Sequence, residues 1–307
     1  MSMEATVGSK IKKQSLFDAI SAFTHSTTIR LLLGNRKSKI GLIILIAYIF
    51  IGIFGGLLSP YSPTAYEFAA NLPPSLAHPL GTTAYGQDVF SQILTGIGPT
   101  LAVGFLTGII ATGISVLAGL SAGFSSEGVS SAINAVTNVF LVIPGIVIIM
   151  LFGAFFLGDH TSLGYIAMIV ILSLTGWAWG ARTLRSQALS TAKNDFITSS
   201  LLIGEKRLSI IFRQIIRAML PIIVSNFFFT AIYGVMGLTF VEYLGVGNLL
   251  EVNLGTTLYW AINNQAYITG EWWWIMPPSI LISLLMFTFV LINFGVDEVS
   301  NPSLRKY

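Results

Sequence analysis

The chain of 307 residues contains no cysteine, which excludes a disulfide framework, a thiolate nucleophile and a zinc–thiolate site. Charged residues are also scarce, at 9% of the chain against roughly 25% in ordinary soluble domains. Hydrophobic residues make up 54%, and the mean hydropathy is +0.79. A soluble protein of this size could not cover its surface with so few charges, whereas lipid requires no such cover. The composition therefore predicts a protein embedded in a lipid bilayer.

The sequence is equally poor in the residues that catalysis, metal binding and nucleotide binding require. Its three histidines, His25, His78 and His160, are scattered and lack the spacing of a metal site. There is no Gly-x-x-x-x-Gly-Lys-Ser/Thr loop, so the chain has no motif for hydrolysing a nucleotide. The net charge of +3 is too small to indicate a nucleic-acid partner. We therefore expect no catalytic residue, no metal site and no cofactor bound by this chain itself.

Long apolar stretches are what the sequence does contain. A helix needs roughly 20 apolar residues to cross the hydrocarbon core. Stretches of that kind lie at 40–58, 98–123, 133–157, 163–181, 218–241 and 274–294. Prolines fall in the third, fifth and sixth stretches, and such kinks are tolerated where neighbouring protein satisfies the freed backbone groups. We predict an all-α integral membrane protein with six transmembrane helices.

The basic residues predict how the helices are oriented. They lie before the first stretch, between the fourth and the fifth, and at the end of the chain: Lys10, Lys12, Lys13, Arg30, Arg36, Lys37 and Lys39, then Arg182, Arg185, Lys193, Lys206, Arg207, Arg213 and Arg217, then Arg305 and Lys306. These are all 16 of the Lys and Arg residues in the chain. If the N-terminus is inside and the chain crosses six times, every one of them is cytoplasmic, as the positive-inside rule expects.

This orientation predicts the organisation of the whole chain. The expected parts are a cytoplasmic N-terminal segment (1–39), the transmembrane domain (40–304) with external segments 59–97 and 242–273 and a cytoplasmic loop 182–217, and a cytoplasmic tail (305–307). The second external segment carries Trp260 and the run Trp272-Trp273-Trp274. Tryptophans at the edge of a span usually anchor at lipid headgroups. A platform on which a ligand stacks is the alternative.

The loop 182–217 is short but has internal organisation. Asn194 or Asp195 can cap a short helix from Phe196 to Ile203, and Gly204 can end that helix in a left-handed turn. A second amphipathic piece, Leu-Ser-Ile-Ile-Phe-Arg-Gln-Ile-Ile-Arg, follows and leads into the fifth span. It is expected to place Arg213 and Arg217 one helical turn apart, where both reach the interface. The short helix can act either as a rigid lever in front of a span or as an interfacial anchor for the loop.

At this loop the sequence resembles a known family. Trp177-Ala-Trp-Gly-Ala-Arg182-Thr-Leu-Arg185, followed by Asp195-Phe-Ile-Thr-Ser-Ser-Leu-Leu-Ile-Gly204, is similar to the ATPase-docking loop of ABC importer permeases. The match is to the second permease of the dipeptide/oligopeptide branch. Thr198-Ser199-Ser200 stand where the family has Glu-Ala-Ala, and Arg217 stands where a proline is common, although Pro221 matches a later proline.

Further motifs extend the resemblance along nearly the whole chain. They are His78-Pro-Leu-Gly81-Thr with Gly86-Gln-Asp88, Gly123-Phe124, Phe140, Pro144, Tyr243-Leu-Gly245-Val-Gly247, Asn293-Phe-Gly295-Val-Asp297 and Asn301-Pro302. Three charged positions of the family fall on Ser130, Ala135 and Asn138, so those charges are absent together. Several motifs in order at the right spacing are a specific signal, where a single Gly-x-Gly would not be.

The resemblance implies a type I ABC importer permease of the cell membrane and a set of partners. These are a second homologous permease, two ATPase subunits that bind ATP and magnesium, and a solute-binding protein on the outside. It also implies that one segment docks in a groove of an ATPase and couples it to the spans: Asp195, Phe196, Ile197, Thr198, Ser199, Ser200, Leu201, Leu202, Ile203, Gly204 and Glu205. The transported solute is expected to be an oligopeptide or an oligosaccharide; nickel, which the same branch also carries, has no visible site here.

Polar side chains inside the predicted spans are candidates for lining the translocation path. They are Asn134, Asn138, Thr175, Ser225, Asn226 and Tyr233. Each of them could instead make a hydrogen bond between helices, which is the commoner role of such residues.

Two other functional classes are weighed against the importer. The spans are nearly free of ionisable side chains, with Glu242 at an outer margin and Asp88, Glu127 and Asp159 in loops, so a proton- or sodium-coupled carrier is hard to build. A stand-alone carrier or channel remains the alternative, and it would work without an ATPase partner. An enzyme within the membrane has no catalytic constellation to support it.

Overall fold

The computed structural model describes residues 34–156 and 164–300. Predictions that fall on 1–33, 157–163 and 301–307 lie outside the described residues, among them most of the N-terminal segment, His160 and the tail 305–307. Within the described ranges all regular elements are helices, the segment 59–88 is non-helical, and the β-structure consists of an isolated bridge between Thr82 and Asp88. This agrees with the predicted all-α class.

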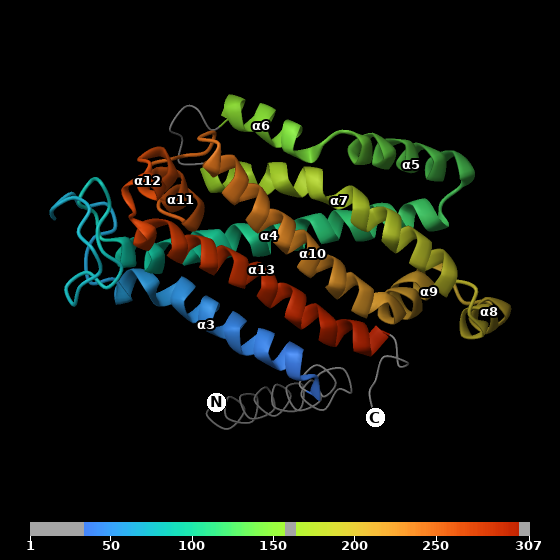
Figure 1. The fold of residues 1–307 in the computed structure, drawn as a ribbon. Coiled ribbons are helices and arrows are strands. Elements are labelled where there is room, and N and C mark those ends of the chain that lie inside the picture. The colour runs from blue at the N-terminus through green and yellow to red at the C-terminus, as the bar shows by residue number, and fades with distance from the viewer. Residues whose placement is uncertain (1–33, 157–163, 301–307) are drawn as a thin grey trace, which may run out of the picture.

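The helices form one elongated bundle (Figure 1). In chain order they are α3 (Arg36–Leu58), α4 (Val89–Phe124), α5 (Glu127–Val142), α6 (Gly145–Phe156), α7 (Gly164–Thr191), α8 (Asp195–Leu202), α9 (Arg207–Ile210), the π-helix η1 (Ile211–Ile215), α10 (Ile216–Tyr243), α11 (Leu254–Asn263), α12 (Ala266–Thr269) and α13 (Trp272–Ser300). Among the described residues, five helices are long and apolar enough to cross a membrane: α3, α4, α7, the continuous stretch Leu208–Tyr243 that ends in α10, and α13. The sixth crossing requires α5 and α6 together.

The third predicted span, 133–157, is not one straight helix. It consists of α5 and α6, which are bent by 80° at the break between them. Pro144 lies at the break, where it has no N–H to continue the ladder and disfavours helical backbone at the residue before it. Accordingly Ile143 is extended, with ψ of 125°. The helix also starts earlier than expected, because Glu127 is the first residue of α5 and not part of a loop.

The second span also starts earlier than the sequence predicts, at Val89 rather than at residue 98. Asp88 caps it by accepting hydrogen bonds from the backbone N–H and the hydroxyl of Ser91, at 2.8 and 2.6 Å. The other carboxylate oxygen of Asp88 is 2.8 Å from Nδ1 of His78, and both side chains are buried. Because the first turns of α4 contain polar residues, hydropathy alone did not predict this start. They are tolerated because Ser91 and Gln92 are buried in protein rather than in lipid.

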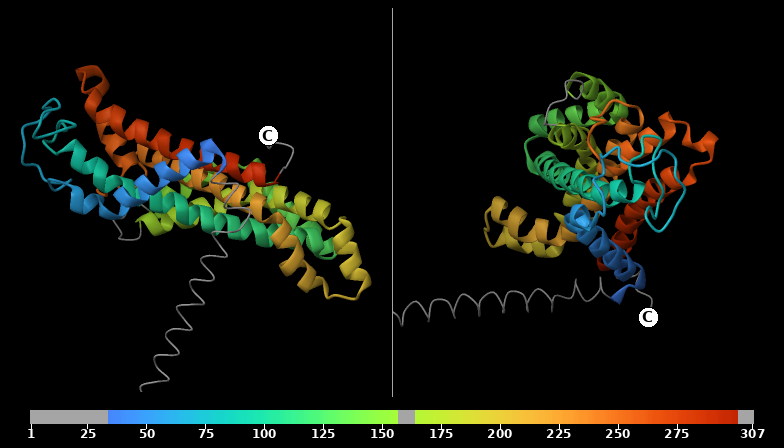
Figure 2. Two further views of the ribbon diagram at one scale, coloured as in Figure 1. Left: turned by 90° about the horizontal axis from the view of Figure 1, so that it is seen from below. Right: turned by 90° about the vertical axis from the view of Figure 1, so that its left-hand side faces the viewer.

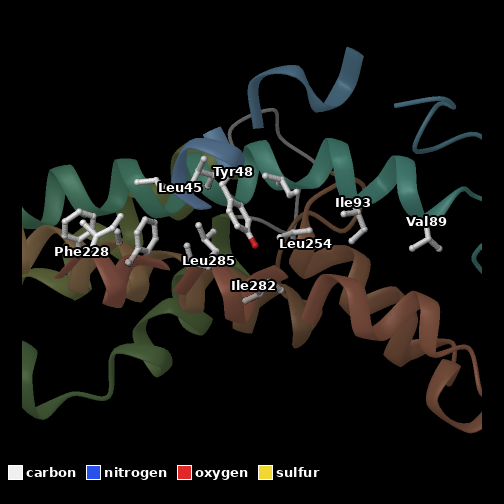
Figure 3. Packing of buried hydrophobic residues seen from close by; sticks show 14 of the residues in the cluster. Leu45, Tyr48, Val89, Ile93, Phe228, Leu254, Ile282 and Leu285 are labelled. Carbon is white, nitrogen blue, oxygen red and sulfur yellow. The ribbon is translucent and has the colours of Figure 1, made fainter. Parts of the chain in front are cut away.

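The largest group of buried apolar side chains joins α3, α4, α10, α11 and α13 (Figure 3). Tyr48 of α3 lies in this cluster, and its hydroxyl donates to the Leu281 carbonyl at 2.8 Å, so its polar end is satisfied as well. Trp274 is fully buried in the same cluster. Trp273 packs against this cluster, and its indole N–H donates to the Thr82 carbonyl at 3.3 Å. The expectation of headgroup anchoring is therefore wrong for Trp274, whereas Trp272 is exposed.

The two ends of the bundle differ in construction (Figures 1 and 2). The segment 59–88, α11 and α12 lie together at one end, which we call the loop end. The beginning of α3, the end of α13 and the short helix α8 lie toward the other, which we call the α8 end. At the loop end Asn253 caps α11 with a reciprocal capping box, and its Nδ2 donates to Oε1 of buried Glu242 at 2.6 Å. The segment 242–273 is thus tied to the last turn of α10.

Helices α3 and α4 approach each other closely through glycine. A Cβ added at Gly55 would overlap the Leu94 carbonyl oxygen. At the next residue, Gly56, a Cβ would meet nothing within 4 Å. Small residues that let helix backbones approach are a common means of packing in membranes.

These neighbouring glycines provide a matched test of the packing. We expect Gly55→Ala to lower the stability of the protein by about 1–3 kcal/mol, because backbone must move to admit the methyl group. Gly56→Ala should be neutral or stabilising by up to about 1 kcal/mol through helix propensity. Thermal unfolding of the purified protein in detergent, followed by size-exclusion chromatography, measures both. Equal stability of the two variants would contradict the close approach.

Candidate functional site: the segment between α7 and α10

The segment that the sequence analysis singled out projects from the α8 end of the bundle. Helix α7 continues to Thr191, well beyond the predicted end of the fourth span at residue 181. Helix α8 follows and lies beyond the ends of α7 and α9 (Figures 1 and 2). The chain then returns through α9 and η1 into α10.

Helix α8 runs from Asp195 to Leu202, one residue earlier at each end than predicted. Asn194 occupies the N-cap position but makes no side-chain capping hydrogen bond, so the predicted side-chain cap is wrong in that respect. The C-terminal turn is as expected: Gly204 has φ of +85°, in the left-handed region. Its N–H donates to the Leu201 carbonyl and the Glu205 N–H to the Ser200 carbonyl, both at 3.1 Å. This pair of bonds is a Schellman motif.

Glycine is required at position 204 by backbone conformation rather than by space. A Cβ added there would meet nothing within 4 Å. A left-handed backbone is costly for any residue that has a Cβ, least so for Asn and Asp.

The apolar side chain of Ile197 attaches α8 to the bundle. Ile197 is only 2% exposed. It belongs to a cluster with Leu184 and Ala188 of α7, Ile215 of η1 and Met219 of α10, among others. Ile197 therefore joins α8 to an apolar cluster that also contains the end of α7 and the beginning of α10.

A polar network between α8 and the chain that follows it adds a second attachment. Nε2 of Gln214 donates to Oγ of Ser200 and to Oε2 of Glu205, each at 2.8 Å. The hydroxyl of Ser209 donates to Oε1 of the same carboxylate at 2.7 Å. Hydrogen bonds to a charged group are the stronger kind. The network joins the C-terminal half of α8 to α9 and η1.

The helix in which Gln214 lies is not the regular amphipathic α-helix that was expected. Residues Ile211–Ile215 form a π-helix, in which the Ile216 N–H bonds to the Ile211 carbonyl. A π-turn inserts one residue and so changes the direction of the side chains that follow. Arg213 and Arg217 therefore do not stand one regular α-turn apart, although both are exposed.

The free end of α8 presents apolar side chains to the surroundings. Leu202 is 84% exposed and Ile203 is 86% exposed, and Phe196 and Leu201 are about half exposed. These residues lie on a helix that projects from the bundle rather than on a membrane span. Exposed apolar side chains grouped in this way are typical of a contact with another protein or with a membrane surface.

The six candidate path residues all make hydrogen bonds, and the five helices α4, α5, α7, α10 and α13 take part in them. Tyr233 donates to Thr175 at 2.8 Å, and Asn226 of α10 donates to Thr112 of α4 at 3.1 Å. The remaining pairs are Arg182 donating to Asn138 at 2.6 Å, Ser225 donating to Asp297 at 3.4 Å and, within α5, Asn134 donating to Ser130 at 3.4 Å.

Three of the candidates also lie together in one pocket. Thr175, Asn226 and Tyr233 line a cavity of about 250 Å³ between α5, α7 and α10, with Phe140 and Phe229 among its walls. The structure does not bring Asn134, Asn138 or Ser225 into this cavity. A small uncharged pocket of mixed polarity can accommodate part of a neutral or zwitterionic solute.

Comparison with known families identifies the chain. Residues 115–306 match the family described as binding-protein-dependent transport system inner membrane component. The chain belongs to that family. Residues 26–74 also match the N-terminal transmembrane domain of oligopeptide transport permease C. The chain is thus a multi-pass subunit of the cell membrane, with a role in transport rather than catalysis.

Individual relatives agree with this family. The dipeptide transport system permease protein DppC of Bacillus subtilis (strain 168) is 27% identical over 281 residues, covering 90% of this chain and 85% of the relative. The oligopeptide transport system permease protein OppC of the same organism is 24% identical, with 89% and 88% covered. The resemblance to the second permease of the peptide branch is confirmed.

A solved structure has the same fold. A chain of the MetNI methionine ABC transporter in an inward-facing conformation matches with a TM-score of 0.55 at 22% identity, covering 70% of this chain and 97% of that one. The type I ABC importer permease fold is therefore confirmed.

Sequence reasoning missed Gln214, which contacts two residues of the predicted coupling segment. Its role depends on the π-turn, and no local pattern predicted that turn. The pair formed by His78 and Asp88 was also missed as a contact, although both residues had been singled out within one motif.

The network around Gln214 can be tested without any partner. Gln214→Met keeps the size of the side chain but removes the donor, and we expect it to loosen the segment by roughly 1–2 kcal/mol. Hydrogen–deuterium exchange of residues 195–206 should then become about 5- to 30-fold faster.

Thr198→Val is the matched control, because the exposed hydroxyl of Thr198 bonds only to its own helix, at the Asn194 carbonyl. This control should leave the exchange rates within about twofold, a change of less than roughly 0.5 kcal/mol. If the two variants exchange alike, Gln214 does not hold α8.

Proposed function

We propose that this chain is the second permease of an ATP-driven importer of oligopeptides, coupled through α8 to an ATPase subunit. The observation that carries the proposal is the form of α8, whose buried Ile197 shares an apolar cluster with residues of α7 and α10, and whose C-terminal end exposes Leu202 and Ile203. Membership of the binding-protein-dependent family supports the importer, and the names of its peptide-transporting relatives support the solute.

The α8 end is proposed to lie in the cytoplasm and the loop end outside. All 16 basic residues belong to segments that this orientation places inside. Two ATPase subunits would bind ATP and magnesium, since this chain has no phosphate-binding loop. A second homologous permease would complete the path, and a solute-binding protein would deliver the solute at the loop end.

The geometry of α8 suits a lever. When nucleotide binding closes the ATPases, a groove holding Phe196, Leu202 and Ile203 would carry α8 with it. Because Ile197 shares an apolar cluster with α7 and α10 and Gln214 bonds to both Ser200 and Glu205, the displacement would move the two long helices together. Close-packed interiors transmit such displacements. The rest of the segment from Asp195 to Glu205 completes the proposed docking element.

The path is proposed to run between the two permeases. On this side Thr175, Asn226 and Tyr233 are the stronger candidates, because they share one pocket. Asn134, Asn138 and Ser225 remain candidates that would reach the path only if the helices rearrange. None of the six is charged, which suits a neutral or zwitterionic peptide.

A charge at the tip of α8 tests the coupling. Leu202→Glu should leave folding unchanged, because the side chain is 84% exposed. It should lower the amount of ATPase that co-purifies with the permease by roughly tenfold or more, as expected for a central apolar contact, and abolish uptake of a labelled peptide.

Leu202→Met keeps the apolar contact and should behave as the unchanged protein does. A Leu202→Glu variant that still retains its ATPase and transports peptide would contradict the docking role. Peptide uptake without any ATPase subunit would instead favour a stand-alone carrier.

The orientation has its own test, made simple by the absence of cysteine. Leu76→Cys, at a fully exposed position of the loop end, and Ser190→Cys, at an exposed position of α7 outside the proposed docking element, each introduce the only thiol of the chain. In intact cells a membrane-impermeant maleimide should label the first and not the second. After permeabilisation both should react, and the reverse pattern in intact cells would overturn the orientation.

A further inference from the structure

The loop end lacks positive charge. No lysine or arginine occurs between Lys39 and Arg182 or between Arg217 and Arg305. Acidic residues do occur there, with Glu67 and Glu251 at least partly exposed. A surface with carboxylates and no basic residue attracts cationic groups.

A pocket at this end has the side chains that bind a cation. It has a volume of about 260 Å³ and lies between the segment 59–88, the beginning of α4, the segment 249–252 and α11. Three aromatic residues line it: Tyr66, Tyr85 and Trp260. The ring of Tyr85 is nearly perpendicular to both others, at interplanar angles of 88°, with centroids 6.4 Å from Tyr66 and 5.7 Å from Trp260. Rings grouped at such angles can surround one cationic group, which their π-electrons attract.

The carboxylate of Glu251 lines the same pocket. Its Oε1 accepts a hydrogen bond from Asn248 at 3.1 Å, which holds the side chain in place. Within the described residues no lysine, arginine or histidine forms an ion pair with Glu251. The pocket therefore contains a negative charge whose counter-ion the described part of the chain does not supply.

The walls of the pocket are held in place before any ligand arrives. The indole N–H of Trp260 donates to the Leu249 carbonyl at 3.1 Å, which fixes the ring. Gln87 and Gln92 also line the pocket, and Nε2 of Gln92 donates to Oε1 of Gln87 at 2.9 Å and to the Pro63 carbonyl at 3.2 Å. Preformed walls reduce the ordering cost of binding.

We propose that this pocket receives one lysine or arginine side chain of the solute-binding protein that docks at the loop end. The pocket is smaller than the roughly 300–1,000 Å³ typical of sites for whole ligands, so it suits a single side chain rather than an oligopeptide. This inference rests on the proposed function, which supplies the binding protein. It adds the chemistry of the contact, namely a pocket lined by three aromatic rings and one carboxylate.

A side chain bound in the pocket would affect the long helices. The segment 249–252 leads directly into α11, whose cap Asn253 is bonded to Glu242 near the end of α10. A docked side chain would therefore contact the segment 249–252. This segment leads to Asn253, which is hydrogen-bonded to the end of α10, and the beginning of α10 shares an apolar cluster with α8.

The test uses the complete transporter in lipid nanodiscs and its purified binding protein. Glu251→Gln should weaken binding of that protein by about tenfold, because it removes the charge but keeps the size of the side chain. It should also flatten the dependence of the affinity on salt. Trp260→Leu should weaken binding to a similar extent, through loss of the aromatic wall.

Glu67→Gln is the matched control, since Glu67 is an exposed carboxylate of the same end that does not line the pocket. It should change the affinity by less than about twofold, as rim charges do. If the unchanged transporter and the Glu251→Gln variant bind the binding protein with equal affinity, the inference is overturned and the proposed function remains intact. No binding to the unchanged transporter would instead overturn the proposed function.

A second arm distinguishes the source of the cation. If the pocket receives the amino group of the solute, Glu251→Gln would raise the KM for a free peptide but not for its N-acetylated form, at unchanged affinity for the binding protein. That result would also overturn the inference. The expected result is an equal effect on both peptides, arising from weaker docking.

Discussion

Hydrocarbon offers no hydrogen-bond partner, so polar groups within the bilayer favour partners in the protein itself. The all-helical architecture follows for the backbone, and pairing between helices follows for the side chains. Thr175 with Tyr233 and Asn226 with Thr112 are examples that join α7 to α10 and α10 to α4. Three of these four residues, Thr175, Tyr233 and Asn226, are also the candidates proposed for the translocation path.

Charge divides the molecule into two ends with different chemistry. Basic residues gather at the α8 end, where Lys37 at the beginning of α3 lies 4.3 Å from the ring of Phe294 near the end of α13. The loop end holds carboxylates, aromatic rings and hydrogen-bonded loops, but neither lysine nor arginine. This is the asymmetry of lysine and arginine that the positive-inside rule describes. Each end is left with a surface that suits a different kind of partner.

The rigidity of α8 comes from three contacts of different kinds. Burial of Ile197 supplies most of the apolar contact, the Schellman turn at Gly204 satisfies the last carbonyls, and Gln214 joins the helix to the returning chain. Thr198-Ser199-Ser200 replace the Glu-Ala-Ala of the family that this chain resembles, and here Ser200 takes part in the network through its hydroxyl. A departure from the family pattern is thus accommodated by a local set of hydrogen bonds.

The sequence by itself determined the features that depend on neighbouring residues. These include the number and approximate position of the apolar stretches, the all-α class, the left-handed turn at Gly204 and the family. The tertiary structure decided the features that depend on residues far apart in the chain: the burial of Trp274, the cap of α4 by Asp88 with His78, the contact of Gln214 with Ser200, and the pocket that brings Tyr85, Glu251 and Trp260 together. The physical reason is that hydropathy and backbone preference act over a few residues, whereas burial and hydrogen bonding are set by whichever segments the fold brings into contact.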